Sequence, residues 1–452
     1  MLVLASLYFA IEARRGSQGD PRAPGSAEDI VGLAARADLN VLFVLVDTLR
    51  ASRLGSYGYE RDTSPEIDRL ASTGVRFAHH LAQSSWTKCS MASLWTSLYP
   101  SRTGVTRFDD VLPASAELPA EILKRAGFRT VGIYRNGWVA PTFGFDQGFD
   151  VYTRPAPRPP PPSVRRENPT LVSRGTDEDA VASAVEFLRA SGDERWFLYL
   201  HLMDVHEYLY DEETALFGGS YSDVYDNSIR WTDRVLGVLL DQLAAEGQRA
   251  KTLIAIAADH GEAFRERGVE GHARRVYPET TEVPLVLSFP FRLEPGVVVE
   301  ARTRNVDIWP TLLELVGLEP PGGIDGRSLV PDILASERGE APSDAGRTGV
   351  AYLDQHWGQR GRDPLPSIAV VEGPLRYVRA TERGRVVEQL FDRARDAAEL
   401  EDRAGADPAA FERLRGLADA HLEAAPVWGE APTREMDELE LNQLRALGYA
   451  IP

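Results

Sequence analysis

The sequence is poor in cysteine, in long apolar runs and in positive charge. Cys89 is the single cysteine among 452 residues, which excludes an internal disulfide and any metal site built from several thiolates. Lys and Arg number 50 against 68 Asp and Glu, so the net charge is −18. Such a surface repels phosphate groups, and we therefore expect no nucleic-acid partner.

The apolar segment at the N-terminus is short. Residues 1–13, MLVLASLYFAIEA, are apolar for about twelve residues, whereas a membrane span needs ~20. We interpret this segment as the end of a signal anchor or a signal peptide, which predicts a cell-envelope or periplasmic protein, anchored to the membrane in the first case. A docked tail is the alternative. Residues 14–38 are rich in Gly, Pro, Ser and charge and predict a linker, so 1–38 precede the folded domain.

Strand-like and helix-like stretches alternate from Asn40 onward. Helical patterns begin at Pro65, after Thr176 and near Tyr225. The alternation predicts an α/β fold in three layers, α/β/α, around a largely parallel sheet over residues 39–335. Apolar runs predict core strands at 40–46, 129–134, 196–202, 252–259 and 283–289.

The composition changes after about residue 331 and becomes rich in Ala, Arg and Glu. Residues 368–380 predict a hairpin and residues 411–422 a helix. We therefore expect residues 336–452 to form a small C-terminal α+β subdomain with a tail.

Polar side chains follow four of the five predicted core strands, among them Asp47, Asn136 and the pair Asp259-His260. In open α/β sheets, ligands bind beyond the carboxyl ends of the strands. One aspartate there usually caps a helix or forms a turn, but turns alone do not account for four such endings. Two aspartates and a histidine suit one divalent cation. The sequence thus predicts that Asp47, Asp259 and His260 meet around a metal.

The segment Ser84–Gly104 is dense in Ser and Thr just ahead of a helical stretch. By itself this is an ordinary helix start. A hydroxyl at a helix N-terminus also gains from the helix dipole and from free backbone N–H groups that can hold an anion. A bound cation can ionise such a hydroxyl at neutral pH, so this segment is where we expect a nucleophile.

Several motifs occur in the order in which the sulfatase family of the alkaline phosphatase superfamily has them. They run from Asn40 to the C-terminus and include NVLFVLVDTLR, TSPEIDRLASTGVRF, SLYPSRTG, HLMDVHEY, DHGE, VPLVLSFP and NQLRALGYA. The chain therefore resembles a sulfatase. The resemblance implies an alkaline phosphatase-like fold and a metal-dependent hydrolase of sulfuric or phosphoric esters, with a small-molecule, glycan or lipid ester as substrate.

The segment around the nucleophile departs from the family pattern. Sulfatases place a Cys or Ser ten residues before a Gly, and counting back from Ser97, which replaces that Gly, leads to Thr87. Cys89 stands where the family has Pro and Met91 where it has Arg, so Cys89 is expected to be a buried structural thiol and not a formylglycine precursor. Thr87 matches the threonine of phosphoethanolamine transferases and lipoteichoic acid synthases.

Thr48 replaces the second of two adjacent aspartates that sulfatases carry after the first strand. This resembles the phosphonate monoester hydrolases, which hold a single metal with one histidine ligand. The resemblance thus implies one divalent ion, Ca, Mn or Zn. Its ligands would be Asp47, Asp259, His260 and Thr87.

Further roles follow from the resemblance at matching positions. His206 and His272 would contact the oxygens of the sulfuryl or phosphoryl group and serve catalysis. Asn136 and Lys88 would bind substrate. Glu262 would orient His260 or cap the next helix, and Thr48 would support the metal ligands.

Three functions remain open from the sequence. The first is ester hydrolysis through a covalent Thr87 intermediate. The second is transfer of a phosphoryl-linked head group to an acceptor of the cell envelope, which a threonine ester would permit. The third is a non-catalytic binding protein that keeps the fold and the metal. A mutase is disfavoured because ligands for a second metal are missing from the sequence. The oligomeric state is not readable.

Overall fold

The computed structural model describes residues 20, 22–155, 158–169, 175–340, 347–359 and 362–436. The interpretation of residues 1–13 as an anchor or signal falls outside these ranges and stays a prediction. Within the described ranges, no helix combines the length and the apolar character that a membrane crossing requires.

The main sheet has eight strands in the order β10-β2-β9-β6-β1-β5-β3-β4. Strand β1 lies inside it, parallel to β5 on one side and to β6 on the other. Strand β9 runs antiparallel to both β6 and β2, so the sheet is mixed but largely parallel. The strand bounds are β1 Asn40–Val46, β2 Val75–Leu81, β3 Arg129–Ile133, β4 Val151–Thr153, β5 Trp196–Leu202, β6 Thr252–Ala257, β9 Leu285–Ser288 and β10 Val297–Arg304.

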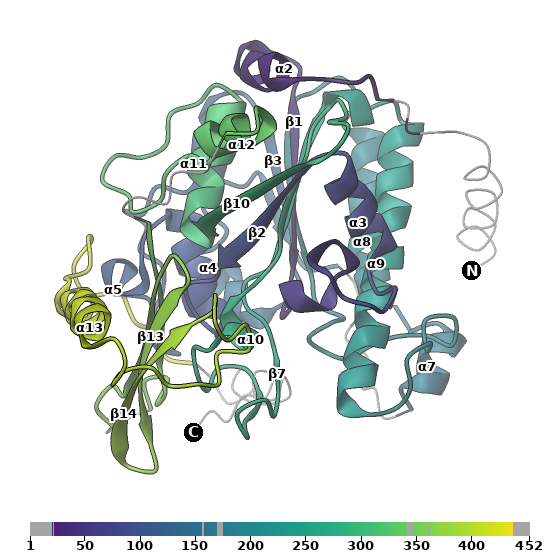
Figure 1. Ribbon diagram of the computed structural model, residues 1–452. Helices are drawn as coiled ribbons and strands as arrows, with labels where there is room; N and C mark the ends of the chain where they lie inside the picture. The colour runs from purple at the N-terminus through teal and green to yellow at the C-terminus, as the bar shows by residue number, and fades with distance from the viewer. Residues whose placement is uncertain are drawn as a thin grey trace.

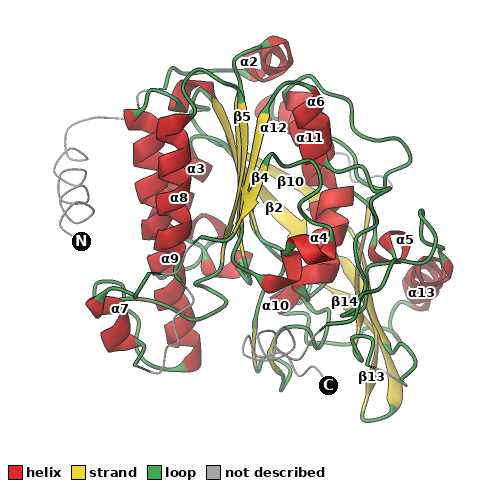
Figure 2. Ribbon diagram, turned by 180° about the vertical axis from the view of Figure 1, so that it is seen from behind, coloured by secondary structure: helices red, strands yellow, loops and turns green. Residues whose placement is uncertain are grey.

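Helices cover both faces of this sheet, as Figures 1 and 2 show. One face carries α3 Pro65–Ser72, α8 Asp177–Ala190 and α9 Tyr221–Ala245, and the other α4 Thr87–Thr96, α11 Ile308–Leu315 and α12 Val330–Glu337. From Val41 to Val46 strand β1 is apolar, because helices pack on both of its faces. Val41, Phe43 and Leu45 join the core under α4 and α11, while the alternate residues join the core under α8 and α9.

The remaining helical elements are short, apart from α13. They are α2 Ala27–Gly32, α5 Pro100–Thr103, α6 Pro119–Arg125, α7 Pro162–Glu167, α10 Pro278–Thr281 and α13 Pro408–Glu423, and the 3-10 turns η1 Leu33–Ala35, η2 Ala51–Arg53, η3 Gly55–Tyr57, η4 Gly137–Val139, η5 Pro141–Phe143, η6 Arg249–Lys251 and η7 Asn305–Asp307. The expected linker is folded over residues 22–38, where helix α2 places Ile30 and turn η1 places Leu33 in the core. Their helical spacing buries them together, despite the polar composition around them.

A second sheet of four antiparallel strands follows the main one: β11 Thr348–Asp354, β12 Pro366–Glu372, β13 Leu375–Glu382 and β14 Arg385–Asp392. The predicted hairpin is β12–β13, and the predicted helix is α13, which packs on this sheet. Ala369 and Val378 belong to the main core, whereas Val370 and Tyr377 face Leu414 of α13. The small C-terminal α+β subdomain therefore shares a core with the larger one. A two-stranded ribbon, β7 Ala263–Phe264 with β8 Glu270–Gly271, completes the strands.

Candidate active site

The ends of β1 and β6 bring three predicted ligands together. Asp47 follows β1, and Asp259-His260 follow β6 after one intervening residue. Because the two strands are adjacent and parallel, their carboxyl ends lie side by side. All three side chains are fully buried. One possible ligand atom from each lies within 4.8 Å of the others, so this group, the metal cluster, could hold a cation.

Asp47 is held as an anion by three donors. Thr48 Oγ1 donates to Oδ1 at 2.8 Å and Asn136 Nδ2 to Oδ2 at 2.6 Å, and His201 Nε2 lies 3.0 Å from the same Oδ2. Burial by itself would raise the pKa of Asp47, but His206, His201 and His260 outweigh it and hold the pKa below its usual range.

Asp259 and His260 each have an electron pair that is not neutralised by any lysine or arginine of the described residues. Asp259 Oδ2 is buried without a hydrogen-bond partner among the described residues, and burial together with the charge of Asp47 raises the pKa of Asp259 well above normal. The Nδ1 atom of His260 lies 3.1 Å from the Gly261 carbonyl oxygen, which fixes the proton on Nδ1. The bare Nε2 then faces Asp259 Oδ2 at 3.3 Å and Asp47 Oδ1 at 3.7 Å.

This donor set fits a divalent cation. Two carboxylates and an imidazole nitrogen converge, and no lysine or arginine of the described chain forms an ion pair with either aspartate. Burial lowers the pKa of His260 to about 3, so the imidazole is neutral and free to ligate. The mixed oxygen and nitrogen set is compatible with Ca, Mn and Zn.

Thr87 lies at the first position of helix α4, beside the metal cluster. Its Oγ1 is 3.1 Å from His260 Nε2 and 3.4 Å from Asn136 Nδ2. Ten residues on, Ser97 ends the helix with φ 56°, the left-handed conformation that glycine adopts at least cost. This agrees with the glycine that the sulfatase pattern has there, and with the count that leads to Thr87.

Thr48 joins the two aspartates through a strained backbone. Its φ is 67°, which is costly for a β-branched residue. In this conformation the Thr48 N–H donates to Asp259 Oδ1 at 3.2 Å, while its hydroxyl bonds Asp47. The Tyr225 hydroxyl, on α9, donates to the Thr48 carbonyl at 2.6 Å and fixes the turn. The predicted supporting role of Thr48 thus has a definite geometry.

His206 and His272 lie next to each other at the edge of the metal cluster. Their rings are 4.9 Å apart, and the His272 ring is 4.6 Å from that of His260. Burial lowers the pKa of His206 to about 4, so its ring is neutral. Burial acts in the same direction on His272, but Glu262, 3.3 Å from its Nδ1, outweighs this and raises the pKa of His272.

Glu262 differs from its predicted role. The carboxylate neither orients His260 nor caps a helix, because the chain continues as strand β7. It bonds His272 and accepts from the Tyr208 hydroxyl at 2.7 Å. The DHGE motif does not reveal this, since the partners come from two other segments of the chain.

Lys88 of helix α4 and the remaining polar strand endings lie apart from the metal cluster or at its edge. The Lys88 ammonium donates to the carbonyls of Phe108 and Asp110 at 2.5 and 2.7 Å, and no contact joins it to the metal cluster. The side-chain amide of Asn136 donates a hydrogen bond to Asp47. Arg135, its neighbour, pairs instead with Asp204 in a separate buried group of charges. The structure therefore divides the strand endings between two clusters.

His201 is a neighbour of the metal cluster that the sequence does not indicate. It lies inside strand β5, where a histidine is usually structural, yet it bonds Asp47 and also the Tyr199 hydroxyl, which is 2.8 Å from its Nδ1. Only the register of β5 beside β1, which sets Leu45 opposite His201, would have identified it.

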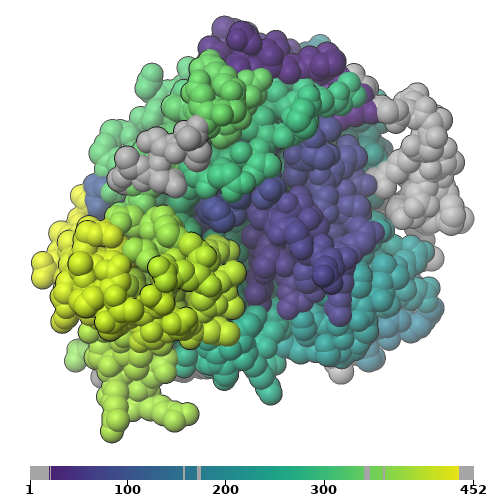
Figure 3. Space-filling model, in the orientation of Figure 1, coloured from purple at the N-terminus to yellow at the C-terminus, as the bar shows by residue number. Residues whose placement is uncertain are grey.

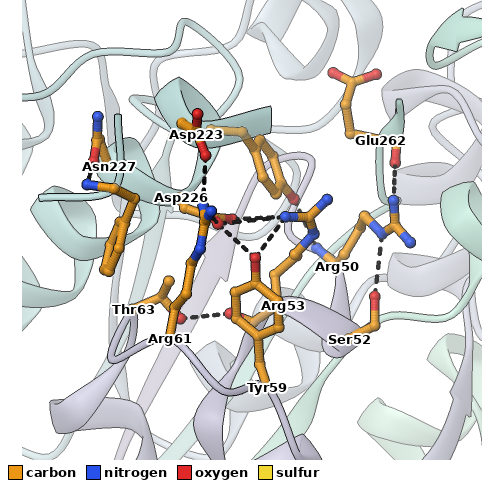
Figure 4. Close-up of polar contacts among 12 residues, drawn as sticks. Arg50, Ser52, Arg53, Tyr59, Arg61, Thr63, Asp223, Asp226, Asn227 and Glu262 are labelled. Carbon is orange, nitrogen blue, oxygen red and sulfur yellow. Dashed lines mark hydrogen bonds and ion pairs between the residues drawn. The ribbon is translucent and has the colours of Figure 1, made fainter. Parts of the chain in front are cut away.

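Charged contacts fix the loop that follows Asp47, as Figure 4 shows. Asp226 of α9 accepts from Tyr59 at 2.5 Å and from Arg53 and Arg61 at 3.1 and 2.7 Å. Arg50 donates to the main-chain oxygen of Glu262 at 3.0 Å. These bonds tie the segment after β1 to α9 and to the segment after β6, so both aspartates keep their positions.

A cleft of about 1220 Å³ opens over the two histidines. His206, His272, Glu262 and Tyr208 line its inner part. Its outer part is formed by residues 267–275 and by the β13–β14 hairpin of the C-terminal sheet. This cleft thus offers a substrate a route to the site between the main domain and the C-terminal sheet.

The family comparison agrees with this architecture. The sulfatase family model matches residues 39–318, and the model of the C-terminal region of N-sulphoglucosamine sulphohydrolase matches residues 271–403. The first match spans more than half of the chain. The resemblance predicted from the motifs is therefore confirmed.

Individual relatives are distant but extensive. An ulvan-active sulfatase of Formosa agariphila is 25% identical over 421 residues, covering 85% of this chain and 80% of that protein. Arylsulfatase A of Bos taurus is 28% identical over 376 residues, covering 72% and 73%. The solved phosphonate monoester hydrolase of Silicibacter pomeroyi superposes with a TM-score of 0.64 at 22% identity, covering 85% and 95%. The predicted alkaline phosphatase-like fold is confirmed.

Proposed function

This chain belongs to the sulfatase family and is a hydrolase of sulfate esters, and we propose that it acts through Thr87 as a covalent nucleophile beside a divalent cation. The observation that carries the proposal is a hydroxyl next to three buried groups that converge on one another. Asp47, Asp259 and His260 direct electron pairs to one point, and the Thr87 hydroxyl lies 3.1 Å from one of them.

The cation would be held by Asp47, Asp259 and His260. Bound there, it neutralises the carboxylates and lowers the pKa of an adjacent hydroxyl. Thr87, at the start of helix α4, then attacks sulfur in line with the leaving oxygen. The backbone N–H groups at the start of α4 and the Asn136 amide would stabilise the charge that develops on the transferred group.

The two histidines divide the proton transfers. Glu262 lies beside Nδ1 of His272 and raises the pKa of that ring, which favours the doubly protonated form, and its Nε2–H would be the donor for the leaving oxygen. His206 is neutral and would take the Thr87 proton in the first step. In the second step water attacks the Thr87 ester and passes its proton to His272, which lost its own to the leaving group. His206 then returns its proton to the Thr87 oxygen, so the anion is released and all three residues are restored.

Phosphoryl chemistry is the second candidate, and Thr87 itself favours it. Formylglycine releases sulfate by collapse of a hemiacetal, and a threonine ester has no second oxygen for that route. Displacement by water or by an acceptor alcohol is required, which suits a phosphoryl group. Hydrolysis of a phosphate or phosphonate ester, or transfer to an acceptor, would follow from the same site.

One incubation series tests these proposals. Metal-replete protein is mixed with an aryl sulfate, a phosphate monoester, a phosphate diester and a phosphonate monoester, then analysed by turnover and intact mass. We expect a mass increase on Thr87 whose size identifies the transferred group. Thr87→Ala should lose at least about 10³-fold in rate, as the removal of a nucleophile does elsewhere.

The matched control is Thr96→Val. Thr96 is a second buried threonine of α4, and its hydroxyl donates to the Ala92 carbonyl at 2.7 Å, on the opposite end of the helix from the cluster. This variant should keep the wild-type rate within about twofold. Equal rates for Thr87→Ala and wild type would refute the nucleophile.

A further inference from the structure

We propose that Arg274, Arg383 and Arg385 bind a second anionic group of the substrate, so that the enzyme acts on an acidic oligosaccharide and not on an isolated ester. This inference rests on the proposed function, because it assumes that the ester to be cleaved occupies the metal cluster. The three residues, called here the arginine triad, line the same cleft as His206 and His272.

The charge of the cleft is opposite to that of the chain. Five arginines and only two glutamates line it, although the protein carries a net charge of −18. Two of the five are already paired, Arg267 with Glu279 and Arg275 with Glu382. The arginine triad has no ion pair with any described residue. Unpaired arginines in a concave surface suit carboxylate or sulfate, which they can bind bidentately.

The two segments that carry the triad are braced against each other. Arg275 pairs with Glu382 at 2.7 Å, and the chain neighbours of these two residues, Arg274 and Arg383, remain unpaired. Gln355 adds a second brace, since its amide accepts from the Thr381 N–H at 3.3 Å and donates to the Arg274 carbonyl at 3.3 Å. The triad is thus held on a fixed framework, although its side chains are exposed.

The hairpin β13–β14 carries the outer two arginines away from the body of the protein. It ends in Arg383-Gly384-Arg385 and projects as a finger in Figure 3. Val386, next to the tip of this hairpin, is 66% exposed. Because this hairpin lines the catalytic cleft and carries arginines without an ion-pair partner, it can bind a part of the substrate that lies beyond the ester to be cleaved.

The size and lining of the cleft indicate the substrate class. A volume of about 1220 Å³ exceeds the ~300–1,000 Å³ of sites for single small ligands. Amides and an indole, from Gln355, Gln359 and Trp357, stand beside the charges, as hydroxyl-rich sugar rings require. The apolar wall that a lipid chain would need is missing from the described lining, in which Ala273, Val269 and Val387 are the aliphatic residues.

Binding to Thr87→Ala protein tests the triad without turnover. A fluorescent, sulfated hexasaccharide derived from heparin is the probe, with an uncharged dextran hexamer as comparison. The variant is Arg383→Ala/Arg385→Ala, in which both changes are exposed and leave the fold intact. We expect affinity for the sulfated probe to fall by at least about tenfold, as the loss of charge-assisted contacts requires. The dextran hexamer should bind weakly to both proteins.

The control is Arg125→Ala/Arg129→Ala, which removes the same charge from an exposed surface. Its affinity for the probe should stay within about twofold of the parent. With Thr87 intact, the control Arg125→Ala/Arg129→Ala should hydrolyse a small aryl ester at the parental rate. Unchanged probe affinity in Arg383→Ala/Arg385→Ala, or an equal loss in the control, would overturn the inference. Binding that depends on the triad in a protein that turns over no ester would refute the proposed function alone.

Discussion

Two carboxylate sites of this protein are buried to a similar extent and have opposite surroundings. Asp259 is fully buried beside Asp47 with one oxygen unpartnered. Glu282, whose side chain is 11% exposed, lies between Arg302, Arg376 and Arg393 at 3.1, 2.5 and 3.2 Å.

The pKa shifts of the two sites run in opposite directions. Burial and Asp47 raise the pKa of Asp259. Burial acts the same way on Glu282, but the three arginines outweigh it and lower its pKa. The charge of Glu282 is neutralised by arginines of the same chain, so we call this the complete site. The charges of Asp47 and Asp259 are not, so this incomplete site requires a cation from solution. The difference separates a structural ion cluster, which docks the C-terminal sheet, from a site built to bind.

The largest effect should come from breaking the complete site. Glu282→Gln removes the carboxylate that Arg302, Arg376 and Arg393 share, leaving Arg376 paired with Glu399 at 2.7 Å, and should lower the free energy of unfolding by about 3 kcal/mol. Chemical denaturation monitored by circular dichroism measures this. The control Glu300→Gln, at an exposed glutamate, should change the stability by less than about 0.5 kcal/mol. A stable Glu282→Gln protein would show that the arginines do not depend on Glu282.

A divalent cation bound at Asp47, Asp259 and His260 should stabilise the folded protein. Protein stripped with EDTA should gain about 2.7 kcal/mol of unfolding free energy when a divalent cation is added at about a hundred times its dissociation constant. Titrations with Ca, Mn and Zn would rank the three ions. Glu282→Gln should show the same gain, because its cluster is separate. A gain absent from all three titrations would contradict cation binding.

Acid should reduce the contribution of Glu282 to the free energy of unfolding in a defined pH range. The pKa of Glu282 is lower in the folded state than the ~4.3 of an unfolded chain. Its contribution is therefore full above about pH 5 and is lost as the pH falls towards the folded value. The stability difference between wild type and Glu282→Gln should shrink by up to about 1.4 kcal/mol per pH unit below pH 4. Urea unfolding of both proteins from pH 3 to 6 measures this, and a constant difference would refute it.

The smallest effect should come from removing the Tyr199 hydroxyl that holds His201 against Asp47. Tyr199→Phe removes the hydroxyl beside His201, which should cost about 1 kcal/mol of stability and weaken cation affinity by roughly tenfold or less. Tyr152→Phe is the control, since its hydroxyl donates to the Val139 carbonyl at 2.7 Å and is not bonded to the site. It should lose similar stability and keep its cation affinity. Equal affinity losses would remove the proposed link through His201.

Sequence patterns predicted the elements whose residues are buried on both faces. The runs at β1 and β5 predicted the strand bounds to the residue, because every position in them is buried and all but Asn40 and His201 are apolar or aromatic. Strand β2, VRFAHHL, was missed since charged and histidine side chains interrupt it. The direction of β9 was not predictable either. An antiparallel strand between two others shows no sign in its own apolar run.

The metal cluster was predictable because strand order follows from a shared fold class, and side chains at adjacent strand ends must lie close together. The hydrogen-bond partners of those side chains were harder to predict from the sequence. Arg135 and Asn136 are neighbours in the chain but point into different clusters. Glu262 bonds a histidine ten residues away and a tyrosine of another loop. Such contacts depend on backbone turns, like the left-handed Thr48, that no residue pattern specifies.

The most direct test of the account is the unfolding temperature of Asp259→Asn with and without a divalent cation. The amide keeps the Thr48 contact and places an N–H group where the unpartnered oxygen was, 3.3 Å from His260 Nε2. In EDTA we predict a melting temperature at or above that of the wild type, and no rise when the cation is added. A variant that melts lower in EDTA, as Glu282→Gln should, would contradict the claim that this site lacks a positive charge of its own.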